Sequence, residues 1–125
     1  MMELTAQTDN AFLSGRDELF VIKLSNVLYM EADDHYTHIY YGVDQHFLVP
    51  YGLSAVEQAC TVRVGNPHHL MRLGRKYLIN IDRIGYINFV KGTITLVDLL
   101  GKSAILNVSK PVLRGLSNLI QSNKT

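Results

Sequence analysis

Three basic side chains, Arg72, Arg75 and Lys76, lie close together in the sequence, just before an apolar run that ends at Asn80. An arginine guanidinium can donate two hydrogen bonds to O6 and N7 of a guanine, and a lysine ammonium can neutralise a phosphate. These residue types therefore offer the chemistry needed to hold a polyanion. Each could equally be an ordinary solvated charge, so the cluster alone leaves both interpretations open.

The charges of the chain are divided unevenly between its two halves. Residues 1–62 hold two basic and nine acidic side chains, a net charge of −7. Residues 63–125 hold ten basic and two acidic side chains, a net charge of +8, so the overall charge of +1 conceals the division. A basic half of this kind predicts a polyanionic partner that meets one face of the fold.

A second polar cluster, Asp33-Asp34-His35-Tyr36-Thr37-His38, combines carboxylates with imidazoles. Its spacing matches no closed zinc pattern, and the one cysteine, Cys60, adds no set of thiolates, so we expect no metal and no cofactor. Imidazole and hydroxyl groups of His35, Thr37 and His38 could instead donate to phosphates or bases. The two Asp residues would then shape the turn and point away from an anionic partner.

The chain of 125 residues is long enough for one domain with its own core, and its hydrophobic content of 47% fits an ordered protein. It contains no apolar run long enough to span a membrane and no secretory signal, which together with a single cysteine predicts a cytoplasmic protein. Cys60 is expected to be buried and inert. Because no glycine-rich phosphate cradle or nucleophile motif is visible, we expect no enzymatic activity.

Short runs rich in β-branched and aromatic residues, separated by turn residues, predict a mostly β domain. We expect strands over residues 19–23, 27–30, 37–41, 45–49, 84–89, 93–97 and 103–108. Gly42 is expected to take a positive φ in one hairpin turn, and Lys91-Gly92 marks the clearest hairpin. Residues 1–16 are predicted to form a flexible segment ahead of a domain at 17–121.

Two helices are expected between and after these strands. Ser54 and Glu57 have the spacing of a capping box and predict a short helix, followed by an irregular connection over 61–69. Ser109 can cap a closing helix whose apolar stripe includes Leu113 and Leu116. Lys110 and the free N–H groups at the start of that helix would together attract a phosphate, and Arg114 one turn later is a weaker candidate.

Three segments, in order along the chain, carry a resemblance to a known family. They are residues 27–37, the run Met71-Arg72-Leu73-Gly74-Arg75-Lys76-Tyr77-Leu78-Ile79-Asn80, and Val108-Ser109-Lys110. The middle one is similar to the signature Phe-x-Arg-Val-His-Arg-Ser-Tyr-Leu-Val-Asn of LytTR-type DNA-binding domains, which occur in bacterial response regulators and transcription factors. The chain departs from that family at Gly74, where His is typical, and at Lys110, where Arg is common.

The resemblance implies three small antiparallel sheets in an elongated bundle with two or three short helices. It also implies that loops, rather than a recognition helix, enter successive major grooves of double-stranded DNA. Base contacts would then come from Arg75, Lys110 and Thr37. Phosphate contacts would come from Arg72, Lys76, Arg114, His35 and His38, while Asn80 and Ser109 would support the site structurally.

The function that these observations favour is sequence-specific DNA binding by a bacterial transcription regulator. The resemblance implies direct repeats bound by two copies, with at most a weak or DNA-induced dimer and no membrane partner. We expect no receiver domain, because too few residues precede the β-rich region to form one. The alternative is a protein-interaction module that docks an acidic partner through the basic C-terminal half.

Overall fold

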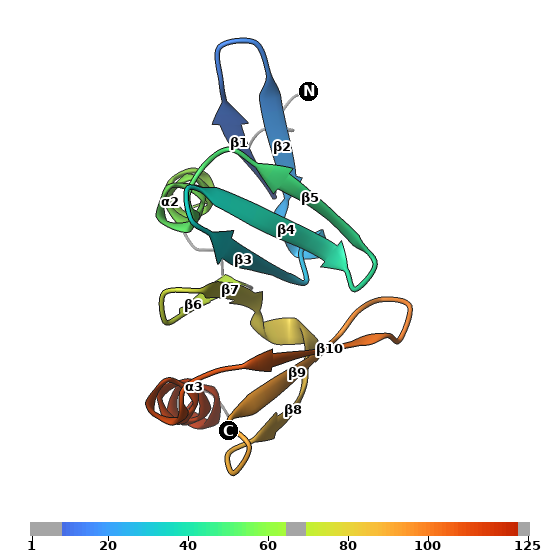
Figure 1. Cartoon of the computed structure of the whole chain (residues 1–125), viewed down its shortest axis with the longest axis vertical. Coiled ribbons are helices and arrows are strands. Elements are labelled where there is room, and N and C mark those ends of the chain that lie inside the picture. The colour runs from blue at the N-terminus through green and yellow to red at the C-terminus, as the bar shows by residue number, and fades with distance from the viewer. Residues whose placement is uncertain (1–8, 65–69, 123–125) are drawn as a thin grey trace.

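The computed structural model describes residues 9–64 and 70–122, and in this part of the chain it contains three antiparallel sheets and two α-helices. Figure 1 shows these elements stacked along one long axis, with the five-stranded sheet between the smaller two. The mostly β fold with three small sheets is therefore confirmed.

The central sheet has the strand order β5-β4-β3-β7-β6. Its strands are β3 (Tyr29–Asp33), β4 (Tyr36–Gly42), β5 (Gln45–Val49), β6 (Leu70–Leu73) and β7 (Tyr77–Asn80). Because side chains alternate along a strand, Met30 and its partners Ile39 and Leu78 lie on one face of the sheet. Tyr29 and Ile79 lie on the other face. Both faces are apolar, so each must be covered by another layer.

One face is covered by helix α2 (Leu53–Val64) and by the hairpin of β1 (Asn10–Ser14) and β2 (Leu19–Lys23). Ala11 and Leu13 of β1 are buried in this first core. The prediction of a flexible segment over residues 1–16 is therefore wrong for 10–14. Three consecutive apolar residues, of which the first and third are buried, form a strand there once β2 supplies its hydrogen bonds. Residues 1–8 lie outside the described part of the chain.

The opposite face is covered by the three-stranded sheet and the closing helix. The sheet has the order β10-β9-β8, formed by β8 (Ile84–Asn88), β9 (Thr93–Val97) and β10 (Ser103–Asn107). Helix α3 (Lys110–Ser122) buries Leu113 and Leu116 in this second core, as its apolar stripe predicted. Short 3₁₀ turns η1 (Leu24–Asn26) and η2 (Ile81–Arg83) complete the elements of residues 9–64 and 70–122.

Three local predictions need correction. Helix α2 begins at Leu53, so Ser54 lies inside its first turn rather than before it, and the helix runs on through residues 61–64. The rest of the predicted connection, 65–69, lies outside the described residues. Gly42 ends β4 without a positive φ. A Cβ there would lie 3.3 Å from Asp98 Oδ2, so a larger residue would require the carboxylate to shift by a few tenths of an ångström.

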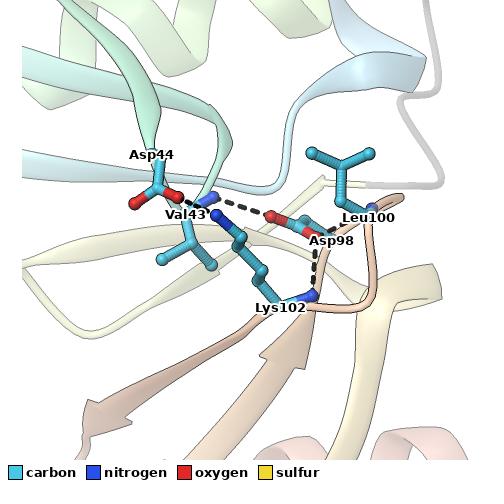
Figure 2. A network of polar contacts seen from close by, with 5 residues as sticks. All are labelled: Val43, Asp44, Asp98, Leu100 and Lys102. Atoms are coloured by element: carbon cyan, nitrogen blue, oxygen red, sulfur yellow. Dashed lines mark hydrogen bonds and ion pairs between the residues drawn. The ribbon is translucent and has the colours of Figure 1, made fainter.

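Asp98 connects the central sheet with the three-stranded sheet. Figure 2 shows its carboxylate between the backbone of the β4–β5 turn and that of the β9–β10 turn. It accepts hydrogen bonds from the N–H groups of Val43 at 3.0 Å and of Leu100 and Lys102 at 2.9 Å each. The Lys102 ammonium reaches back to Asp44, so two turns far apart in sequence are fixed to each other.

Candidate nucleic-acid interface

The β6–β7 turn presents the central basic residues of the sequence motif. β6 ends at Leu73, which pairs with Tyr77 of β7, so residues 74–76 form the whole turn. Gly74 has φ +64°, a conformation that costs glycine little. Arg75 and Lys76 follow it, and both are exposed. The turn therefore projects two cations from the edge of a well-packed sheet.

Arg72 belongs to the same motif but faces another way. It pairs with Leu78 in the β6–β7 register, which places it on the sheet face that α2 covers. Its Nη1 lies 2.6 Å from Glu57 Oε1 of α2, and its Nε and Nη2 donate to backbone carbonyls of the turn. The predicted phosphate contact from Arg72 conflicts with this arrangement, because its donors are already engaged within the protein.

Lys76 keeps its charge in a partly acidic setting. Its Nζ lies 5.4 Å from the centre of the Tyr77 ring and 3.5 Å from Glu31 Oε2. Tyr77 and Glu31 together raise the pKa of Lys76, so the ammonium stays protonated at neutral pH. The side chain is 59% exposed, and an exposed ion pair of this kind is weak enough to be exchanged for another anion.

The start of α3 lies against the β6–β7 turn. A shallow groove between them is lined by Arg75, Lys76, Asn107, Ser109 and Val112, among others. The Ser109 carbonyl accepts the first helical hydrogen bond from the Leu113 N–H at 3.0 Å, and exposed Lys110 opens the helix. Arg75 and Lys76 therefore line a groove next to the positive end of the helix dipole, where Lys110 begins α3.

The β3–β4 turn consists of Asp34 and His35. Asp34 has φ +58°, which Asp tolerates better than most residues, and the His35 side chain is 89% exposed. His35 is therefore accessible, as a phosphate contact requires. The Asp34 carboxylate is 82% exposed on the same turn, 3.7 Å from His35 Nε2.

Two further predicted DNA contacts in this region conflict with the structure. Thr37 is fully buried, and its hydroxyl donates to the Tyr51 carbonyl at 2.8 Å, so it cannot reach a base. His38 Nε2 lies 2.9 Å from Asp33 Oδ2, and its Nδ1 is buried. Both residues belong to β4, in which successive side chains point to opposite faces of the sheet. Thr37 points into the first core, and His38 lies on the other face beside Tyr40 and His46.

Asn80 stabilises the connection that follows β7. It is 2% exposed, and its Nδ2 donates to the Val27 carbonyl at 2.8 Å. Its Oδ1 accepts from the Asp82 N–H at 2.9 Å, which caps η2. Both ends of the amide are therefore used inside the protein, at the end of β7 that leads into η2.

The accessible candidates lie along one side of the molecule. Figure 1 shows the β3–β4 turn, the β6–β7 turn and the start of α3 at the left edge, one below the other. Pairing of β3 with β7 brings the first two together, because the Ala32 N–H donates to the Lys76 carbonyl at 2.8 Å. Arg114 follows Lys110 by one helical turn and is also exposed.

Two residues on this side were not predicted as site residues. Tyr36 is 47% exposed beside the β3–β4 turn, and Asn107 is exposed and lines the groove next to α3. Tyr36 lies within the polar cluster quoted from the sequence, so its position could have indicated it. Asn107 carries no such signal, because only the fold brings the end of β10 to the β6–β7 turn.

The described residues include candidates for two other kinds of chemistry, metal binding and thiol reactivity. In those ranges no group of three or more His, Cys, Asp or Glu side chains is placed to hold a metal ion. Burial raises the pKa of the Cys60 thiol to about 12, so it is not a reactive thiolate. No helix in the described part of the chain is long and apolar enough to cross a membrane.

Comparison with known proteins defines the class to which this scaffold belongs. Residues 17–121 match the LytTr DNA-binding domain family, so the chain is a DNA-binding domain of the kind used in transcription regulation. It belongs to that family. A similar solved structure is the LytTr DNA-binding domain of a protein described as a methyl-accepting/DNA response regulator from Bacillus cereus.

That structure is 21% identical in sequence, with a TM-score of 0.60, and the match covers 90% of this chain and 97% of the other. At this identity it supports the fold. No curated protein sequence matches the chain.

Proposed function

We propose that the chain binds double-stranded DNA sequence-specifically, through turns and a helix start that enter successive major grooves. The observation that carries the proposal is the meeting of exposed Arg75, Lys76 and the start of α3 beside one groove. The β3–β4 turn continues this row along the same side of the molecule. The cations on the β6–β7 turn and at the start of α3 fit the phosphate ridges that border a groove.

Each accessible side chain has a role that its chemistry suggests. Arg75, at the centre of a three-residue turn, donates to a guanine edge, because its planar fork matches O6 and N7. Lys110 contacts a base with less discrimination than an arginine would, since an ammonium is a point donor. Lys76, Arg114 and His35 contact phosphates, which fix register without reading sequence.

The protein acts as a transcription regulator in the cytoplasm of a bacterium and performs no catalysis. Two copies bind an operator made of direct repeats, assembling on DNA rather than as a stable dimer. One copy contacts only a short stretch of DNA. Two copies on neighbouring repeats read twice as many bases, which raises the overall specificity.

The proposal is tested by selecting bound duplexes from a random pool with the whole chain. We expect enrichment of two similar short boxes about one helical turn apart. Arg75→Ala should remove the preference at one base position of each box, at a cost of about 1–3 kcal/mol, while its circular dichroism spectrum and melting temperature stay those of the wild type. Selection of no sequence by the folded wild type would exclude specific binding.

Salt dependence gives a second, independent measurement. With three to four phosphates neutralised by each copy, log K for binding of one copy to a duplex with a single box should fall against log salt with a slope of about −3 to −4. If unrelated duplex DNA competes as well as the selected duplex, the basic side serves general anion or protein docking instead.

A further inference from the structure

We propose that Arg72 is a positioning residue for DNA recognition, which fixes the β6–β7 turn against helix α2 through Glu57. In this arrangement Arg72 touches no DNA, and Glu57, on the far side of the sheet from the second core, determines how Arg75 is presented. The inference rests on the proposed role of Arg75.

Arg72 donates three hydrogen bonds that join the β6–β7 turn to Glu57 of α2, and we call this arrangement the clamp. Nη1 donates to Glu57 Oε1 at 2.6 Å, Nε donates to the Gly74 carbonyl at 2.9 Å, and Nη2 donates to the Arg75 carbonyl at 3.3 Å. These two carbonyls lie immediately before and after the Cα atom of Arg75 in the backbone. Fixing both of them fixes the direction in which the Arg75 side chain leaves the turn.

The other end of the clamp is rigid. Glu57 lies on α2 beside Val56, which is fully buried in the first core together with Leu53 and Cys60. The side chains of Arg72 and Glu57 are only 26% and 34% exposed, so the charge-assisted bond between them is partly shielded from water. The three-residue turn is thereby tied to a packed helix as well as to β3.

Lysine cannot replace arginine in this role. A lysine ammonium keeps the positive charge, but it lacks the planar fork that reaches one carboxylate and two carbonyls in different directions. Arg72→Lys therefore separates the two explanations for this residue: a phosphate contact would survive the change in large part, whereas a clamp would be lost.

A pure charge effect and the clamp predict opposite changes in DNA affinity when Glu57 is neutralised. If charge alone mattered, Glu57→Gln would strengthen DNA binding, because it removes a negative charge from the protein. If the clamp matters, it weakens binding of the selected duplex by at least about fivefold, the lower end of the contribution of one good base contact. Asp34→Asn is the matched control, since it neutralises an exposed carboxylate on the β3–β4 turn and should raise or preserve affinity.

A double-mutant cycle then tests whether Arg72 acts through Arg75. We expect Arg72→Lys to weaken specific binding in the wild type and to add nothing further in an Arg75→Ala background. The salt slope of Arg72→Lys should equal that of the wild type, because no phosphate contact is lost. Additive losses would assign Arg72 to DNA contact and overturn the clamp.

A readout without DNA separates failure of the clamp from failure of the proposed function. Amide hydrogen exchange of Ala32, whose N–H donates to the Lys76 carbonyl of the turn, should accelerate in Glu57→Gln and in Arg72→Lys, but not in Asp34→Asn. Unchanged exchange would overturn the clamp even if DNA binding is real. If exchange is faster in the variants but the wild type selects no DNA, Arg72 does fix the turn, and the proposed DNA-binding function is wrong.

Discussion

The carboxylate of Asp98, in the β9–β10 turn, accepts a hydrogen bond from the backbone N–H of Val43, in the β4–β5 turn, at 3.0 Å. Figure 2 shows this bond within a network that also holds Lys102. The hydrogen bond from Val43 is the main cause of a lowered Asp98 pKa, and the backbone N–H groups of Lys102 and Leu100 act in the same direction. Asp98 therefore stabilises the junction between two sheets in its ionised form.

Asp98→Asn should lower the melting temperature at neutral pH by several degrees, because an amide offers one acceptor oxygen where three N–H groups now donate to two. The folded-state pKa of Asp98 lies below its unfolded value. Its contribution is thus complete above an ordinary Asp pKa of about 3.9 and is lost as pH falls through the folded value. Thermal unfolding over an acidic pH series measures this.

The difference in melting temperature between wild type and Asp98→Asn should therefore shrink on acidification. Asp44→Asn, which removes the neighbouring ion pair with Lys102 and leaves the Asp98 bonds intact, is the control and should cost less. A difference that stays constant down to strongly acidic pH would mean that the Asp98 charge does not contribute.

Lys76 and Arg75 are adjacent but should give different DNA-binding phenotypes. Lys76→Gln is expected to weaken binding of all duplexes alike and to reduce the magnitude of the salt slope by about 1. Arg75→Gln is expected to lose about 1–3 kcal/mol of discrimination at one base position. Titrations of the selected duplex and of single-base variants at several salt concentrations distinguish the two, and interchanged phenotypes would reverse the assigned roles.

Much of the fold follows from local sequence pattern. The strands around Gly42 and around Lys91-Gly92 are rich in β-branched and aromatic residues and are bounded by turn residues, and both hairpins form where expected. The closing helix is equally local, because Leu113 and Leu116 repeat at helical spacing. The strand over 10–14 could not be recognised in this way. Its few apolar residues become meaningful only when β2 pairs with it.

The candidate site was predictable in part. Arg75, Lys76 and Lys110 fall on exposed turns or a helix start, where residue type alone indicates the chemistry. The role of Arg72 depends on the β6–β7 register and on α2, which a motif does not encode. Thr37 was ambiguous for a similar reason, because a polar residue in a strand does not reveal which face it occupies.

Thr37→Val removes a buried hydroxyl that donates to the Tyr51 carbonyl. We expect a loss of about 1–3 kcal/mol in the free energy of unfolding, because the carbonyl loses its partner while the shape is kept. DNA affinity of the folded fraction should not change. Urea unfolding and DNA titration measure the two effects, with Thr37→Ser as a control that keeps the hydroxyl. Weakened DNA binding at unchanged stability would restore Thr37 as a base contact.

Asn80 offers the sharpest test of the structural support behind the site. Its amide donates to the Val27 carbonyl and accepts from the Asp82 N–H, and it is 2% exposed. Asn80→Asp keeps the shape but sets a carboxylate oxygen against the Val27 carbonyl. Ionisation in that buried place is unfavourable, so we expect the folded-state pKa of the new carboxyl to lie above its unfolded value.

A raised folded-state pKa means that the protonated form of Asn80→Asp is the more compatible one, because its O–H can donate to Val27. The variant should therefore be much less stable than the wild type at neutral pH and should recover as pH falls toward about 5. Urea unfolding of both proteins at each pH provides the measurement. The wild type should change little over this range, since Asp98 responds only at lower pH. A variant whose deficit is independent of pH would show that water reaches Asn80 and that the polar contact behind β7 is not sealed.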